Sequence, residues 1–420
     1  MFSWNTCLLV MMLGAVAGMF INWGIYNLAW NKRPISPWGP LPEGISNRGW
    51  NTRIPILGWL RLKSETRTHG YHFWVRPLWI ELGMTVFFGF CYSHYSNLVE
   101  QLGVEDSSQL IWVQLVPFLC LACLLCIATF IDFDERMIPD EVTVFGTLLA
   151  LVIAAFLPES RLLDLTSLES GQVVYLHAHS PKSWFVWTTE PRALLYAMGM
   201  LGFWGLASMP KLCTVRYGFL KGARFMLASV LRPRRKSLGK GERRRRKPFP
   251  VTTAIATGCM LGWAMLYAIW SNGTAEQWES LLSAVIGMTA GLVLVWGVRI
   301  IGQIALRQEA MGFGDVTLMA MIGAFLGWQA VMVTFFLAPF AGVIIGIIQA
   351  ITRRENEMAF GPYLSLAALV VVLFWESIWI RITPALEQYV DALPFVLMVG
   401  LSAMGGMLFA WRLIKEKILA

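Results

Sequence analysis

The chain has 420 residues, of which 56% are hydrophobic and only 14% are charged, and its mean hydropathy is +0.58. Soluble domains carry about 25% charged residues, so this composition excludes an ordinary soluble globular protein. The net charge of +8 does not indicate a nucleic-acid partner, because the excess lies between the apolar stretches. We therefore expect a membrane protein that binds no nucleic acid.

About eleven stretches are long and apolar enough, or nearly so, to cross a bilayer, whose hydrocarbon core of about 30 Å requires about 20 apolar residues per helix. They lie near residues 4–26, 78–97, 109–131, 141–157, 191–208, 251–270, 279–301, 315–328, 330–350, 361–381 and 392–412. Backbone polar groups in hydrocarbon must bond within the protein, and the alternating pattern of a barrel strand is absent. The sequence therefore predicts an all-α, polytopic fold. The first stretch is not expected to be a cleaved signal peptide, because residues 1–10 contain no Lys or Arg.

Basic residues in the connecting segments predict the orientation of these helices. Residues 27–77 hold eight Lys or Arg against two Glu, whereas residues 98–108 and 271–278 hold no Lys or Arg. We therefore expect residues 27–77 and the C-terminus to be cytoplasmic and the N-terminus to lie outside. The densest basic run, residues 232–247, is interpreted as a topology anchor or a contact with anionic lipid.

A charged group inside a membrane span is costly and is a functional hypothesis by default. Asp132 directly follows Ile131 at the cytoplasmic end of the stretch 109–131. Pro139 and Asp140 resemble the start of the next helix, and residues 134–136 are interpreted as a solvated loop. Asp132 is therefore the first candidate for chemistry.

A second carboxylate follows a glycine-rich segment. Gly312 and Gly314 flank Phe313 and precede Asp315, and a helical pattern resumes after them. Glycine permits backbone conformations closed to other residues and lets another chain approach closely. We expect these residues to form a loop that presents Asp315 on the same cytoplasmic side as Asp132.

Two carboxylates on one membrane face suggest a catalytic dyad. Carboxylates that come within a few ångströms do not ionise together easily, so one would activate water while the other, protonated, polarises a carbonyl. Helix caps or topology markers are the structural alternative. An ion-coupled transporter would also use interrupted helices and buried Asp residues, although its carboxylates are expected nearer the bilayer midplane.

Three segments carry a family resemblance. The segment from Gly312 to Asp315 matches the Gly-x-Gly-Asp motif of intramembrane aspartyl proteases, and residues 311–328 resemble bacterial type IV prepilin peptidases. Residues 131–140 are similar to the segment with that family's first catalytic Asp, and residues 360–364 to a third family segment. N-terminal residues 18–26, 54–59 and 76–81 extend the resemblance.

The resemblance implies an aspartic endopeptidase of the bacterial inner membrane that removes the leader peptides of prepilins and pseudopilins after a Gly at the cytoplasmic face. Asp132 and Asp315 would be the catalytic pair, and Gly312, Phe313 and Gly314 the active-site loop. The residues expected to support the site or contact substrate are Pro139, Asp140, Gly361 and Pro362. Proteolysis would need no metal or cofactor, whereas N-methylation, found in many members, would need S-adenosylmethionine. A non-catalytic homologue and a related protease with other substrates are the alternatives.

The chain departs from the family pattern in two places. Many members carry two Cys-x-x-Cys pairs suited to zinc in the loop that corresponds to residues 27–77, which here contain no Cys. Residues 35–40 and 65–70 stand at about those places. Thr317 replaces a Lys that commonly follows the second Asp. Methylation is therefore doubtful, and the three cysteines Cys120, Cys123 and Cys126 are interpreted as packing residues.

The order of these features predicts four parts. Residues 1–100 hold the N-terminal helix, the Cys-free loop and the second helix, and residues 101–157 hold the first catalytic Asp region. Residues 158–250 are interpreted as an insertion with an outer loop, a helix and a basic cytoplasmic loop that includes an amphipathic segment at 216–231. Residues 251–420 hold the second catalytic Asp region and the C-terminal helices.

Overall fold

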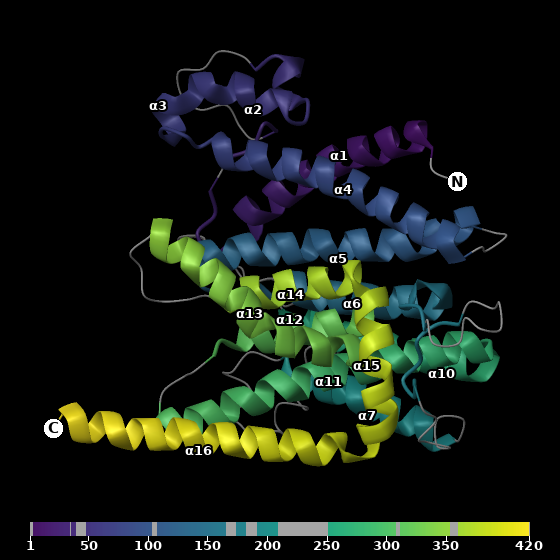
Figure 1. Cartoon of the computed structure of the whole chain (residues 1–420). Helices are drawn as coiled ribbons and strands as arrows, with labels where there is room; N and C mark the ends of the chain where they lie inside the picture. The colour runs from purple at the N-terminus through teal and green to yellow at the C-terminus, as the bar shows by residue number, and fades with distance from the viewer. Residues whose placement is uncertain are drawn as a thin grey trace, which may run out of the picture. The chain divides into compact units, whose positions relative to one another are not determined.

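The computed structural model of the chain describes residues 3–33, 35–38, 48–102, 107–164, 174–181, 191–208, 251–307, 311–352 and 360–419 (Figure 1). These residues are almost entirely helical, and apart from one isolated antiparallel bridge between Leu163 and Tyr175 they contain no β-structure. The prediction of an all-α, multi-pass membrane fold is confirmed. The basic run at 232–247 and the segment 216–231 lie outside the described residues, and the four-part division of the chain stays a prediction.

The longer helices follow the apolar stretches of the sequence. They are α1 (Trp4–Leu28), α4 (Val75–Leu102), α5 (Ser107–Glu135), α6 (Asp140–Phe156), α7 (Pro191–Ala207), α10 (Val251–Asn272), α11 (Ala275–Leu306), α12 (Phe313–Leu326), α13 (Trp328–Thr352), α14 (Gly361–Leu373), α15 (Trp375–Tyr389) and α16 (Leu393–Leu419). Two short helices, α2 (Leu57–Leu62) and α3 (Thr66–His69), lie between α1 and α4.

Five described helical stretches are long and apolar enough to cross a membrane, and they lie at Trp4–Leu28, Ser108–Glu135, Ala254–Asn272, Ala275–Leu306 and Trp375–Ala410. Shorter apolar helices accompany them at Phe313–Leu326, Trp328–Ile344 and Gly361–Leu373. The count of eleven spans is not confirmed. The stretch 361–381 is two helices, because Phe374, with φ −110° and ψ 20°, leaves helical geometry between α14 and α15.

The chain divides into two compact units. The first comprises residues 1–142 and 337–375, and the second comprises residues 143–336 and 376–420. In the first unit α1 packs along α4, α5 packs against both, and α14 packs against α5 (Figure 1). In the second unit α11 is the central helix and contacts α12, α7, α10 and α16.

A buried carboxylate ties the segment between α1 and α4 to the helices of the first unit. Glu81 of α4 is fully buried and accepts hydrogen bonds from Asn22 Nδ2 at 3.1 Å and Trp59 Nε1 at 2.7 Å. It also accepts from the backbone N–H of Ile56 at 2.5 Å, a residue held at φ 66°. Three N-terminal segments that resemble the family therefore meet at one carboxylate.

The helix that carries Asp315 is held by glycines in the second unit. A Cβ at Gly323 of α12 would overlap the carbonyl oxygen of Gly287 of α11, and a Cβ at Gly291 would overlap the carbonyl oxygen of Met319. Small residues let membrane helices approach until their backbones touch, and van der Waals packing then drives association. The α11–α12 contact therefore depends on glycine at these positions.

The outer part of the predicted insertion packs on the far end of the same helix. Arg161 is buried, and its Nη1 donates to the carbonyl oxygens of Ala324 and Phe325, each at 3.3 Å, at the C-terminal end of α12. A cation is favoured there by the helix dipole, although burial lowers the pKa of Arg161 to about 9. Trp328 and Gln329 donate to the carbonyl oxygens of Ala178 and His177 in the segment 174–181. Arg161 and the segment 174–181 thus cap one end of α12.

We predict that Gly291→Ala will destabilise the second unit by about 1–3 kcal/mol, because the new methyl group must push α12 away from α11. Gly297→Ala on the same helix is the matched control, since its Cβ would meet only Leu401 Cδ1 at 3.8 Å. The measurement is the unfolding midpoint of the purified protein in detergent. Equal midpoints for the two variants would contradict a backbone contact between α11 and α12.

Candidate active site

Asp132 lies in the last turn of α5 and is buried, with 5% of its surface exposed. Its Oδ2 accepts a hydrogen bond of 3.1 Å from the backbone N–H of Gly361, the first residue of α14. The N-terminus of a helix stabilises negative charge through its free N–H groups. One oxygen of Asp132 is thus held by the backbone of α14, and the carboxylate occupies a defined position.

Glycine at 361 is required by this contact. A Cβ there would lie 2.6 Å from Asp132 Oδ2 and 2.8 Å from Ile138 Cδ1. Pro362 follows at the start of α14, where its missing N–H costs nothing. Of the expected supporting residues, Gly361 directly contacts a candidate catalytic carboxylate, and Pro139 and Asp140 lie at the start of α6.

The interpretation of residues 134–136 as a loop was wrong for two of them, although Asp134 is exposed as expected. Asp134 and Glu135 belong to the last turn of α5. Asp134 pairs with Arg76 at 2.7 Å, while Glu135 accepts hydrogen bonds from the backbone N–H groups of Trp30 and Asn31. These acidic groups connect the exit of α1 and the entry of α4 to the end of α5. Charge alone suggested solvation, but each carboxylate has a partner distant in sequence.

Asp315 lies in the first turn of α12 and is also buried, with 6% of its surface exposed. Gly312 precedes the helix, and a Cβ there would lie 3.4 Å from Asp315 Oδ2. The expectation that glycines provide an unusual backbone conformation here was wrong. Gly312 has φ −66°, which any residue adopts, and Phe313 and Gly314 already belong to the helix. A Cβ at Gly312 would make an ordinary van der Waals contact with the carboxylate.

Two further residues position the segment before Asp315. Arg299 of α11 donates from Nε to the carbonyl oxygen of Met311 at 3.0 Å, and its guanidinium lies 5.5 Å from the Phe313 ring centroid. Thr317 is buried and donates its hydroxyl to the carbonyl oxygen of Gly314 at 3.0 Å. The sequence analysis missed Arg299, because an Arg within an apolar stretch carried no motif. Asp132 belongs to the first unit and Asp315 to the second, and their pairing stays a prediction.

The Cys-free loop of the first unit contains a buried ion pair between Arg48 and Glu65. Arg48 donates from Nε and Nη2 to the two carboxylate oxygens of Glu65, each at 2.7 Å, and from Nη1 to the carbonyl oxygen of Ser36 at 2.9 Å. Arg48 and Glu65 are 7% and 3% exposed. The two segments that stand at the places of the family's cysteine pairs are therefore joined through one bidentate ion pair. No group of three or more His, Cys, Asp or Glu side chains suited to a metal occurs among the described residues.

Comparison with known protein families finds a match for the part of the chain that contains Asp315. Residues 252–347 match the type IV leader peptidase family. The match contains α11, α12 and the candidate residues Gly312 to Asp315, whereas Asp132 and Gly361 lie outside it.

Curated relatives agree with the family match. The chain is 36% identical over 102 residues to a prepilin leader peptidase/N-methyltransferase of Aeromonas hydrophila, covering 24% of the chain and 35% of the relative. A Pseudomonas putida protein of the same name is 33% identical over 105 residues, with 24% and 36% covered, and one from Burkholderia pseudomallei is 30% identical over 126 residues, with 29% and 41% covered. The chain thus spans about a third of the length of the first relatives. No solved structure matches it.

We predict that Gly361→Ala will slow any cleavage of a prepilin-type peptide by this protein about 100-fold, because the methyl group displaces the Asp132 carboxylate and an ångström-scale misplacement has this cost. Gly83→Ala on α4 is the matched control, since its Cβ would meet no atom within 4 Å. The measurement is the initial rate of cleavage of a prepilin-type peptide at equal concentrations of folded protein. Wild-type activity in Gly361→Ala would remove Asp132 from the proposed catalytic site.

We predict that Glu65→Gln will destabilise the first unit by about 3 kcal/mol, since it leaves the buried Arg48 guanidinium without its counter-charge. Glu387→Gln, at an exposed position on α15, is the control. A strong metal chelator should leave the unfolding midpoint of the wild-type protein unchanged. A large drop in midpoint with chelator would show that a metal, and not the ion pair, holds the loop.

Proposed function

We propose that the chain is an aspartic endopeptidase that removes the leader peptides of type IV prepilins or pseudopilins. The observation that carries this proposal is the match of residues 252–347 to the type IV leader peptidase family, which contains the buried Asp315 in the first turn of α12. The second carboxylate in the proposal is Asp132, the other Asp at a helix end that is buried and positioned by the backbone. Peptide hydrolysis by two carboxylates requires such positioned, poorly solvated groups.

In the proposed mechanism the two carboxylates share one proton and titrate as a pair. The ionised member takes a proton from water, which attacks the scissile carbonyl, while the protonated member donates to the carbonyl oxygen. The C–N bond of the resulting tetrahedral intermediate then breaks, the leaving amine takes the proton that came from water, and the hydroxyl proton returns to the other carboxylate as the carbonyl re-forms. The contact with Gly361 occupies Oδ2 of Asp132 and leaves Oδ1 for water. Gly312 keeps side-chain bulk away from Asp315, which leaves room for a substrate backbone.

The membrane setting completes the proposal. The site would lie at the cytoplasmic face of a bacterial inner membrane, with the N-terminus outside, the C-terminus cytoplasmic and the basic run 232–247 against anionic lipid. The substrates would reach the site from the membrane with their leaders in the cytoplasm. This placement agrees with the buried carboxylates at the predicted cytoplasmic ends of apolar helices.

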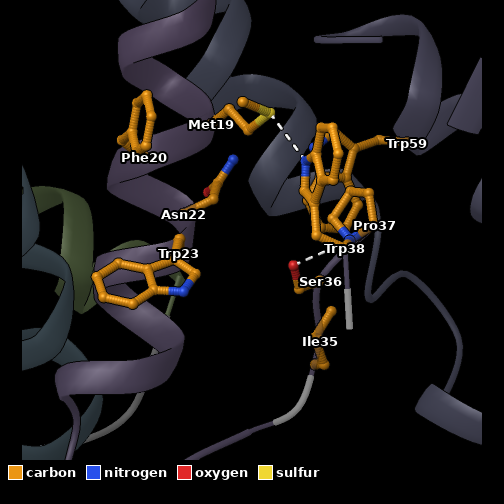
Figure 2. Close-up of a pocket in the computed structure, with 9 residues that line it drawn as sticks. All are labelled: Met19, Phe20, Asn22, Trp23, Ile35, Ser36, Pro37, Trp38 and Trp59. Carbon is orange, nitrogen blue, oxygen red and sulfur yellow. Dashed lines mark hydrogen bonds between the residues drawn. The ribbon is translucent and has the colours of Figure 1, made fainter. Parts of the chain in front are cut away.

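Proteolysis in this proposal requires no cofactor, and N-methylation would require S-adenosylmethionine. A pocket of the first unit lies between α1 and residues 35–38 (Figure 2), and its lining is mostly apolar and includes no carboxylate among the described residues. It therefore offers no carboxylate to pair with the ammonium or to accept from the ribose hydroxyls of S-adenosylmethionine, and it does not fit this cofactor. We assign no methylation step to the described residues.

The test is cleavage of a prepilin-type substrate, with a Gly before the cut and an apolar helix after it, by purified protein in liposomes. We expect Asp132→Asn and Asp315→Asn each to reduce the rate about 1000-fold or more, because each removes a proton-transfer group. Asp134→Asn is the control. Asp134 lies in the same turn of α5 as Asp132, but its carboxylate pairs with Arg76 of α4. Normal cleavage by both variants, or a folded but inactive wild type on several such substrates, would refute the proposal.

A further inference from the structure

The part of the chain between α1 and α4 packs against the sides of these two helices, not beyond their ends. Trp38 Nε1 lies 3.3 Å from Met19 Sδ of α1, and Trp59 Nε1 of α2 donates to Glu81 of α4 at 2.7 Å. Both contacts lie about two turns inside the helix end that joins this part of the chain. Figure 1 shows α2 beside α4 accordingly.

The apolar stretches of α1 and α4 predict the depth of these contacts in a bilayer. The stretches are residues 4–26 and 78–97, so the bilayer centre lies at about position 15 of α1 and about position 88 of α4. At 1.5 Å per residue, Met19 is about 6 Å and Glu81 about 10 Å from this centre, while the hydrocarbon extends about 15 Å from it. Both helices therefore place the segment that contacts them at the level of the hydrocarbon.

The backbone before α2 meets the condition for this depth. Irregular backbone at membrane depth is tolerated where its polar groups bond within the protein. Ile56, at φ 66°, donates its N–H to Glu81 at 2.5 Å. The N–H groups of Leu57 and Gly58 donate to carbonyl oxygens two and four residues earlier, at 2.7 Å and 2.8 Å. The turn that begins α2 is thus satisfied without water.

Apolar side chains of the same turn point away from the protein. Ile54, Leu57 and Leu60 recur at every third position and are 46%, 55% and 48% exposed. Trp50 of the preceding 3-10 helix is 77% exposed. Exposed apolar side chains that cluster in this way mark a surface that contacts a membrane or another protein, and their depth beside α1 and α4 selects the membrane.

The charges of this segment fit a lipid surface. Residues 48–63 contain four Lys or Arg and no Asp or Glu. Arg61 and Lys63 are exposed at the C-terminal end of α2, and the Arg53 guanidinium lies 4.9 Å from the Trp38 ring centroid. Trp gathers at the interface between membrane and water, and long basic side chains reach from there to the anionic headgroups.

The pocket of Figure 2 lies between this segment and α1 and has a volume of about 370 Å³. Phe20, Trp23 and Trp38 line it and are each more than half exposed, and the described lining is mostly apolar. At the level of the hydrocarbon, a lipid chain matches such a lining better than water does.

We propose that residues 48–63, together with Trp38, are embedded in the leaflet of the bilayer in which α1 ends and α4 begins. Ile54, Leu57 and Leu60 contact acyl chains there, and Arg61 and Lys63 contact anionic headgroups. The partner of this surface is the phospholipid bilayer itself. The proposal does not rest on the proposed protease activity.

The test is photo-crosslinking of the full-length protein in liposomes of phosphatidylethanolamine and phosphatidylglycerol, with the photoreactive residue p-benzoylphenylalanine in place of Leu57. Phospholipid adducts of the digested protein are measured by mass spectrometry. We expect at least about fivefold more adduct than with the same residue in place of Tyr71, because an embedded side chain is surrounded by acyl chains. Tyr71 lies between α3 and α4, is 89% exposed and is outside the proposed embedded segment. Phe20, exposed on α1, gives the reference yield of a position that faces lipid.

Adduct at position 20 without adduct at position 57 would overturn the proposal, since it would place the segment in water. Equal yields at positions 57 and 71 would also overturn it, because they would show collision with the membrane surface and not insertion. If the variant at position 57 does not fold, Leu60 on the same helix takes its place with the same expectation.

The headgroup contact has its own test in the same liposomes. We expect the adduct yield at position 57 to rise as phosphatidylglycerol replaces phosphatidylethanolamine, because Arg61 and Lys63 attract the anionic headgroups. The combined substitutions Arg61→Gln and Lys63→Gln should abolish this rise, whereas Arg381→Gln, at an exposed position on α15, should keep it. An undiminished rise in the double variant would overturn the headgroup contact.

Discussion

Hydrocarbon offers no hydrogen-bond partner, so each polar group that this chain buries among its helices must be satisfied within the protein. The described structure follows this constraint at its most important positions. Glu81 accepts three donors, Asp132 accepts the first N–H of α14, and Arg161 donates to the last carbonyls of α12. Each partner comes from another element, so the same bonds that satisfy these groups also position the helices.

This constraint explains how each candidate catalytic carboxylate is supported. Asp132 is positioned by a backbone N–H and by the absence of a side chain at Gly361. Asp315 is positioned through its helix, which contacts α11 along glycines at one face and receives Arg161 at its far end. Backbone contacts of this kind shift less than contacts between flexible side chains. They therefore suit carboxylates that must be held in a fixed position against a peptide bond.

In the Cys-free loop, an ion pair and a hydrogen bond join two segments of the chain. A zinc ion bound by two cysteine pairs would cross-link two segments, and here Arg48 joins them by pairing with Glu65 and donating to Ser36. A bidentate ion pair fixes both distance and angle, but it supplies no tetrahedral centre. The described loop is thus held by side-chain and backbone hydrogen bonds of Arg48, and it provides no argument for methylation.

The sequence by itself determined the helical class, the approximate positions of the helices and the Gly-x-Gly-Asp motif that ends at Asp315, because hydropathy and local motifs depend on neighbouring residues. It also placed Asp132 and Asp315 at helix ends. Only the tertiary structure decided the partners of these groups: the bond from Gly361 to Asp132 joins residues 229 positions apart, and Arg161 reaches Ala324 across 163. Asp134 and Glu135 were misread for the same reason, since their partners lie on α4 and after α1. Such pairings follow from the packing of whole helices, which no local pattern encodes.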